Sequence, residues 1–199
     1  HLTMQLASQV FGIEVAVNAC VYFANGELAY LVRRFDRRNG EKVAQEDFCQ
    51  LSNRSEETHG RNYKYDATYE ECGRLLQRFC AAHAIEVEKL FRRILFCYVC
   101  SNGDAHLKNF SLRQTEYGDY VLTPAYDLLC TSLHFPTESR TALDLFDDFE
   151  SEFFSANGFY GRGDFLKLAE LYGMRPQRAT TYLDHMAEAR SAVAALVER

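Results

Sequence analysis

The sequence predicts an α+β fold, in which a small sheet near the start of the chain is followed by a mainly helical region. Two β-rich runs, residues 14–23 and 28–35, are joined by Asn25-Gly26, a dipeptide typical of tight β-hairpins. Apolar side chains at helical spacing then extend over residues 68–80 and 86–100. Because strand-type and helix-type patterns occupy separate parts of the chain, we expect an α+β protein and not alternating βαβ units.

The elements before residue 68 are predicted from short signals. Residues 1–11 carry apolar side chains at helical spacing and end at Gly12, so the sequence begins within an expected helix, without a capping residue or an initiator methionine. After the hairpin, Gln45 is expected to begin a short helix. Residues 53–66 are polar and without periodicity, which predicts an irregular, mobile loop.

Two helices follow this loop. Thr68, with Glu71 three residues later, has the pattern of a capping box at a helix start. Residues 86–100 give the clearest helical pattern, with one broad apolar stripe made of Leu90, Phe91, Ile94, Leu95, Tyr98 and Val99. We expect this helix to provide a rigid, buried base for the polar segment that follows it.

The last part of the chain is also predicted to be helical. Asp164 is expected to cap a helix that ends at Gly173. Pro176 is expected to open a final helix that runs from residue 177 to about residue 197.

Composition limits the classes of protein to which the chain can belong. With 199 residues, of which 47% are hydrophobic, it is large enough for one globular core. A formal charge of −6 argues against direct coating of nucleic acid, and the longest apolar run, residues 94–100, is too short to span a bilayer. Seven cysteines, an odd number without framework spacing, fit a reducing compartment. We therefore expect a cytoplasmic protein without membrane association.

Residues 101–127 concentrate the side chains that can perform chemistry. The segment opens with Asn-Gly-Asp, a tight-turn tripeptide, directly after the helical pattern. It then places an acid, an imidazole, an amine and a carboxamide close together: Asp104, His106, Lys108 and Asn109. Two β-type runs, residues 109–113 and 120–123, follow around Gly118-Asp119, and Asp127 ends the segment.

This spacing suits phosphoryl transfer. In that chemistry Asp104 orients a hydroxyl nucleophile, while Asn109 and Asp127 hold magnesium on the phosphates. Because Asn109 and Asp127 offer only oxygen ligands, they favour a hard cation such as magnesium over zinc. Judged by spacing only, the alternative is structural: Asn-Gly-Asp is common in turns, and Asp127 can cap a helix that begins near Leu128.

Two motifs in this segment resemble a known family. Asn102-Gly-Asp-Ala-His-Leu-Lys-Asn-Phe-Ser111 and Leu122-Thr-Pro-Ala-Tyr-Asp-Leu128 look like the catalytic and metal-binding segments of the HipA family of serine/threonine kinases, toxins of bacterial toxin–antitoxin modules. The resemblance implies a protein-kinase-like fold and the use of ATP and Mg²⁺. It gives Asp104 the catalytic role and assigns Tyr126 to nucleotide binding. It also implies that His106 and Lys108 approach the phosphates or steady the loop.

A third motif resembles the segment that joins the two lobes of HipA kinases. In Val32-Arg-Arg-Phe-Asp-Arg37 the resemblance places the Arg33 carbonyl and the Phe35 amide at the adenine edge. Gln45 opens Gln-Glu-Asp, which resembles the family's Pro-Gln-Glu-Asp with Ala44 in place of the proline, and is expected near the ribose. Without the resemblance, Arg33 and Arg34 would be interpreted as the solvated end of a strand.

The resemblance also implies a division of the chain. Residues 1–35 correspond to the remnant of an N-lobe, with helix, hairpin and hinge, and residues 36–199 to a helical C-lobe with the catalytic and metal-binding loops. The glycine-rich loop and the phosphate-binding lysine of the family are not in the sequence. We therefore expect a fragment or one half of a split kinase, whose missing N-lobe segment lies elsewhere or on another chain. The hinge residues look closest to the HipT branch. Residues 1–199 alone are expected to be inactive.

Substrate and partners are implied by the resemblance only. The substrate would be an aminoacyl-tRNA synthetase, whose phosphorylation inhibits translation. The partner would be a HipB-like DNA-binding antitoxin, with DNA contacted only through that antitoxin. Two alternatives stay open: a small-molecule phosphotransferase of related fold, and a catalytically silent binding module.

Three further patterns have structural explanations. Cys97-x-x-Cys100 resembles a redox or metal motif but lies in the apolar end of a helix, where core cysteines are expected. Residues 141–152 are acidic and suit calcium or a basic partner, although a solvated acidic face is the simpler interpretation. Residues 158–163 resemble a phosphate-binding loop but follow no predicted strand, so we expect a flexible connection.

Overall fold

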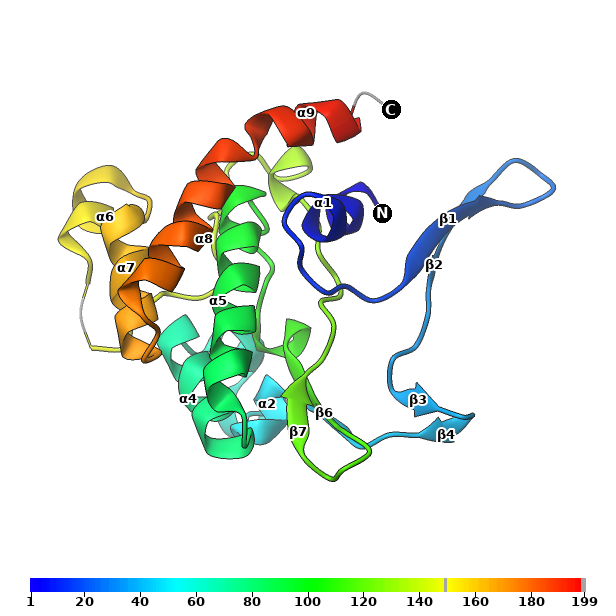
Figure 1. Cartoon of the computed structure of the whole chain (residues 1–199), viewed down its shortest axis with the longest axis horizontal. Helices are drawn as coiled ribbons and strands as arrows, with labels where there is room; N and C mark the ends of the chain where they lie inside the picture. Colours follow the sequence, from blue (N-terminus) through cyan, green and yellow to red (C-terminus); the bar gives the residue numbers. More distant parts are fainter. Residues whose placement is uncertain (149, 198–199) are drawn as a thin grey trace.

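The N-terminal part of the molecule is a helix followed by an isolated hairpin. The computed structural model describes residues 1–148 and 150–197. Helix α1 (Leu2–Gln9) leads through Gly12, at φ 58°, to strands β1 (Asn18–Tyr22) and β2 (Leu28–Val32), which pair antiparallel. Gly26 in the turn has φ 84°, a conformation that favours glycine. The predicted hairpin is therefore confirmed, with shorter strands, and it projects away from the rest of the molecule (Figure 1).

A second, three-stranded sheet supports the polar segment. Its order is β5-β6-β7, and all pairs are antiparallel: β5 (Gln45–Asp47), β6 (Ser111–Gln114) and β7 (Tyr120–Leu122). The predicted start of a helix at Gln45 is wrong, because Gln45 pairs with Arg113 at this sheet edge. Helix α2 (Phe48–Leu51) begins only after Asp47, whose carboxylate accepts the Gln50 amide at 2.9 Å as an N-cap.

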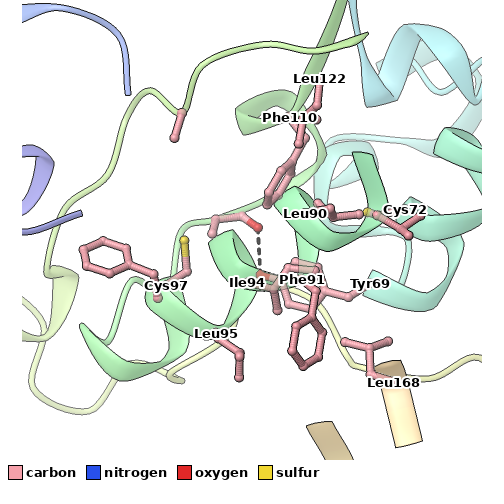
Figure 2. Close-up of a cluster of buried hydrophobic side chains, with 14 of the residues drawn as sticks. Tyr69, Cys72, Leu90, Phe91, Ile94, Leu95, Cys97, Phe110, Leu122 and Leu168 are labelled. Atoms are coloured by element: carbon pink, nitrogen blue, oxygen red, sulfur yellow. Dashed lines mark hydrogen bonds between the residues drawn. The ribbon is translucent and has the colours of Figure 1, made fainter. Parts of the chain in front are cut away.

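Helices α4 (Tyr69–Phe79) and α5 (His83–Val99) form the centre of the core. Figure 2 shows α5 side chains packed with Tyr69 and Cys72 of α4 and with Phe110 and Leu122 from the sheet region. Thr68 caps α4 as predicted, because its hydroxyl accepts the Glu71 amide at 3.1 Å. The Glu71 carboxylate does not close the capping box; it pairs with Arg54 at 2.5 and 2.9 Å.

The predicted apolar stripe of α5 is largely buried. Leu90, Phe91, Ile94 and Leu95 are at most 2% exposed, whereas Val99, at the end of the helix, is 51% exposed and was wrongly assigned to the stripe. Figure 1 shows α5 running through the middle of the molecule. The turn that carries Asp104 therefore follows a largely buried helix.

Residues 53–66 are more ordered than the sequence predicted. They contain a short helix, α3 (Glu56–His59), and a 3₁₀ turn, η1 (Tyr63–Tyr65). Further short elements connect the larger ones: β3 (Arg37–Arg38), β4 (Glu41–Lys42), η2 (Leu107–Asn109) and η3 (Thr131–Leu133).

The C-terminal helices differ in detail from the prediction. They are α6 (Glu152–Asn157), α7 (Arg162–Leu171), α8 (Pro176–Glu188) and α9 (Arg190–Val197). Asp164 lies in the first turn of α7 and not at its cap, since the helix begins at Arg162 and the Asp164 carboxylate accepts the Gly161 amide at 2.7 Å. The single final helix that we predicted is interrupted at Ala189, and α9 then packs near α1.

The structure shows where the three minor motifs lie. In the described ranges, all seven cysteines are free, Cys97 is buried, and no group of three or more His, Cys, Asp or Glu could hold a metal ion. In the acidic region Asp144, Asp147, Asp148 and Glu150 are exposed, as expected for a solvated face, and Phe149 lies outside the described residues. Residues 158–163 lead from the left-handed end of α6 at Gly158 into α7. No helix in the part of the chain that is described is long and apolar enough to cross a membrane.

Candidate active site

The turn that follows α5 is held by its own polar side chain and by a neighbouring segment. Asn102 is 1% exposed, and its side-chain oxygen accepts the Asp104 amide at 3.3 Å. The Gly103 amide donates to the Thr131 hydroxyl at 2.9 Å. A β-carbon on Gly103 would overlap the carbonyl oxygen of Ser139, so only glycine fits here. The backbone of the turn is therefore held closely on both sides of Asp104.

Asp104 presents a partly exposed carboxylate at this turn. Its side chain is 41% exposed, and Nε2 of His106 lies 3.9 Å from Oδ1. The hydroxyl of Tyr65 donates to the same oxygen at 2.5 Å. Tyr65 comes from η1, in the segment that we expected to be irregular. An accessible carboxylate with oriented neighbours can accept a proton or orient a hydroxyl group.

Asn109 and Asp127 lie together although they are far apart in sequence. The Asn109 amino group donates to Oδ2 of Asp127 at 2.8 Å, and Oδ1 of Asn109 accepts the His106 amide at 3.0 Å. Asp127 has φ 56°, and the residues directly after it are not helical. The alternative in which Asp127 caps a helix near Leu128 is therefore wrong.

A cavity of about 390 Å³ adjoins residues 32–36. Of the residues predicted to bind a cofactor, it is lined by Arg33, Phe35, Gln45, Lys108 and Tyr126. The rings of Phe35 and Tyr126 lie 5.5 Å apart, and the Tyr126 hydroxyl donates to the Lys108 carbonyl at 2.8 Å. The cavity is not lined by the other four predicted site residues, Asp104, His106, Asn109 and Asp127. The cavity and these four residues are therefore separate parts of the region.

The backbone of residues 33–35 keeps hydrogen-bonding groups free. The Arg33 amide donates to the Val17 carbonyl at 2.8 Å. Within residues 1–148 and 150–197, the Arg33 carbonyl and the Phe35 amide have no hydrogen-bond partner. Since unpaired backbone groups normally bind water or a ligand, one acceptor and one donor remain available beside the cavity.

Lys108 is held by a carboxylate that the sequence did not single out. Its ammonium lies 2.8 Å from Oδ2 of Asp47, the N-cap of α2. The hydrogen bond that Lys108 donates to the Asp47 carboxylate raises the pKa of Lys108, so the amine stays charged. Of the two roles considered for Lys108, steadying the loop is the one that this contact favours.

Two buried polar atoms in this region lack partners. Nδ1 of His106 and Oε1 of Gln45 are buried without a hydrogen bond in the described residues. Burial, followed by the nearby Lys64 charge, lowers the pKa of His106, which favours the neutral imidazole. Because buried polar atoms are normally paired, each of them fits a position that a bound ligand or its water shell completes.

The donor set also fits a magnesium ion. Asp127 supplies carboxylate oxygens, and Oδ1 of Asn109 keeps one lone pair besides the one that accepts the His106 amide. Magnesium typically uses one or two carboxylates together with phosphates and water. The sequence analysis did not identify three residues that contact the predicted site residues. Tyr65 contacts Asp104, and Asp47 contacts Lys108. The Ser111 hydroxyl lies 2.5 Å from the Tyr126 hydroxyl. Asp47 stood in the noted Gln-Glu-Asp motif, but no sequence signal marked the long-range contact of Tyr65.

The fold and this arrangement define a protein of the kinase-like class, α+β with helices and small antiparallel sheets. Its family can be stated as well. The chain belongs to the HipA-like C-terminal domain family, whose model matches residues 1–194.

Relatives and solved structures agree with this membership. A Haemophilus influenzae protein named "Putative kinase" is 28% identical over 190 residues. The serine/threonine-protein kinase toxin HipA of Shewanella oneidensis is 32% identical over 164 residues. A solved complex of HipA, HipB and operator DNA from Shewanella oneidensis matches with a TM-score of 0.73 and 27% identity. The Helicobacter pylori proinflammatory kinase CtkA, at 10% identity and a TM-score of 0.57, shares the fold.

The chain spans only part of these proteins. The matches cover 87% of this chain and 55% of the Haemophilus protein, and 75% of this chain and 37% of the Shewanella toxin. The structural matches each cover 98% of this chain, but 48% of the Shewanella chain and 80% of CtkA.

Proposed function

We propose that the chain is the C-terminal kinase lobe of an ATP- and magnesium-dependent serine/threonine protein kinase of a toxin–antitoxin system. The observation that carries this proposal is the contact between Asn109 and Asp127 at 2.8 Å beside the turn of Asp104. Asn109 and Asp127 are 18 positions apart in sequence, and the β6–β7 hairpin brings them together. The residues directly after Asp127 are not helical, so Asp127 does not cap a helix there. A purely structural origin of the two motifs does not explain that convergence.

The nucleotide is proposed to occupy the cavity beside the hinge. The free Arg33 carbonyl and Phe35 amide would bind the adenine edge, with Phe35 and Tyr126 supplying aromatic surface. Gln45, with its unpaired buried oxygen, would face the ribose. Lys108, which lines the cavity, would steady the loop. Nδ1 of His106, which has no hydrogen-bond partner among the described residues, would face the phosphates.

Asn109 and Asp127 would hold magnesium by their side-chain oxygens. An ion held there would supply positive charge to the phosphates. Asp104 would orient the hydroxyl of the substrate and accept its proton late in the reaction. The partly exposed Asp104 carboxylate is accessible to such a hydroxyl.

The hairpin provides the attachment for the rest of an N-lobe. Apolar side chains are exposed on both of its strands: Val21, Tyr22, Leu28, Tyr30, Leu31 and Val32. An isolated two-stranded hairpin is marginally stable in water, so further strands are expected to cover it. We assign residues 1–35 to this lobe and residues 36–199 to the helical lobe.

Partners follow from the relatives. The matched Shewanella structure is a complex with HipB and operator DNA, which supports a HipB-like antitoxin as partner and contact with DNA only through it. From the resemblance of the sequence motifs, the proposed protein substrate is an aminoacyl-tRNA synthetase in the cytoplasm. A small-molecule phosphotransferase and a silent binding module are the competing functions.

The test is phosphate transfer from ATP to candidate synthetases by the complete gene product. Asp104→Ala should lower turnover by about a hundredfold or more, as loss of a positioned base does. Asp119→Ala, in the exposed turn between β6 and β7, is the matched control and should leave turnover unchanged. Residues 1–199, which span 48% of the matched Shewanella chain, should show no transfer by themselves. A wild type as inactive as Asp104→Ala on every synthetase and on itself would favour the silent module.

A further inference from the structure

Tyr65 makes a contact with the proposed catalytic carboxylate that no sequence motif indicated. Its hydroxyl donates to Oδ1 of Asp104 at 2.5 Å, across 39 positions of sequence. Hydrogen bonds between a hydroxyl and a carboxylate have this length when they are charge-assisted and strong. The contact therefore constrains one of the two oxygens of Asp104.

The position of Tyr65 is determined by its surroundings. Its amide donates to the Asn62 carbonyl at 2.8 Å within η1. Its ring meets the His106 ring edge-on, with centroids 5.1 Å apart and planes at 76°, and the Lys64 ammonium lies 4.8 Å from the centroid of the Tyr65 ring. An aromatic edge contact and a nearby cation each stabilise one ring orientation. The hydroxyl is thus aimed at Asp104 by several contacts.

The protonation state suits a donor. Burial, followed by the hydrogen bond to Asp104, raises the pKa of Tyr65 to about 12, so the phenol keeps its proton at neutral pH. Oδ2 of Asp104 has no hydrogen-bond partner in the part of the chain that the structure describes. One oxygen is therefore engaged, and the other is left for an incoming hydroxyl.

We propose that Tyr65 is a positioning residue of the kinase: its hydroxyl holds Oδ1 of Asp104, so that Oδ2 receives the hydroxyl of the protein substrate. This inference rests on the proposed kinase function. Tyr65 does not line the cavity assigned to the nucleotide. Its effect should consequently fall on turnover and not on the binding of ATP.

The test is steady-state kinetics of Tyr65→Phe in the complete gene product. Phenylalanine keeps the ring against His106 and removes only the hydroxyl. We expect kcat to fall by about tenfold, the usual consequence of losing one hydrogen bond to a charged group. KM for ATP and the melting temperature should stay at the wild-type values. Tyr63→Phe is the matched control, because it makes the same change in η1 at a hydroxyl without a recorded partner in the described residues.

Each outcome decides the inference. A kcat of Tyr65→Phe equal to that of the wild type and of Tyr63→Phe would show that the contact has no catalytic role. A higher kcat would show that Tyr65 competes with the substrate for Asp104, which also overturns positioning. An inactive wild type would refute the kinase proposal itself, and the inference with it. Because the wild type is measured first, the two failures are distinguishable.

Discussion

Replacing Asp127 by asparagine removes the charge of the side chain and keeps the backbone conformation. Asp127 is exposed and adopts φ 56°, a left-handed conformation that asparagine tolerates about as well as aspartate. The new amide oxygen can still accept from the Asn109 amino group. We therefore expect the free energy of unfolding to change by less than about 1 kcal/mol.

The effect on nucleotide binding should be much larger. Asp127 is the charged member of the Asn109–Asp127 pair, and a unit charge about 4 Å from another contributes about 4 kcal/mol at an effective dielectric constant of 20. Allowing for screening at this exposed site, we expect the magnesium-dependent affinity for ATP to fall by about a hundredfold. Asp127→Ala should lose the same affinity but be less stable, because alanine is strained at positive φ.

Calorimetric titration of the complete gene product with ATP, with and without magnesium, measures this change. Asp119→Asn, at an exposed turn residue, removes the same charge elsewhere and should bind as the wild type does. An affinity of Asp127→Asn equal to that of Asp119→Asn would refute the assignment of Asp127 as a metal ligand.

Three further changes test the fold around the site. Gly103→Ala should cost about 1–3 kcal/mol and abolish most transfer, because the Ser139 carbonyl leaves no room for a β-carbon; thermal denaturation and the kinase assay measure both effects. Phe91→Ala should lower the free energy of unfolding by about 3–5 kcal/mol in a urea titration, since Phe91 is fully buried in the core. A hydrogen bond from Arg178 lowers the pKa of Glu88 below its usual 4.5, so this pair stabilises the fold above that pH and loses its effect as the pH falls through the lowered value. The stability difference between the wild type and Arg178→Ala should thus be present at pH 7 and shrink below pH 4.5; a constant difference would contradict the pairing.

Local chemistry was readable from the sequence alone. Asn25-Gly26 marked the hairpin because few residues adopt the backbone of such a turn. Thr68 marked the start of α4, and the apolar stripe around Phe91 marked α5, since both signals act within a few residues of chain. The α+β class and membership in the HipA-like family followed from patterns of this local kind and from contiguous motifs.

Tertiary structure decided everything that depended on partners distant in sequence. Glu71 satisfies the capping spacing but binds Arg54 instead, because a charged partner from the preceding loop lies within reach. Gln45 joins a strand, since β6 offers it a sheet edge, and Asp127 meets Asn109 only when the β6–β7 hairpin folds back. The contact of Tyr65 with Asp104 belongs to the same group: a polar loop without periodicity gives no sign of where its aromatic side chain will pack. Which hydrogen bonds a side chain makes is determined by the groups that the fold brings within about 3 Å of it, and that proximity is not encoded in spacing along the chain.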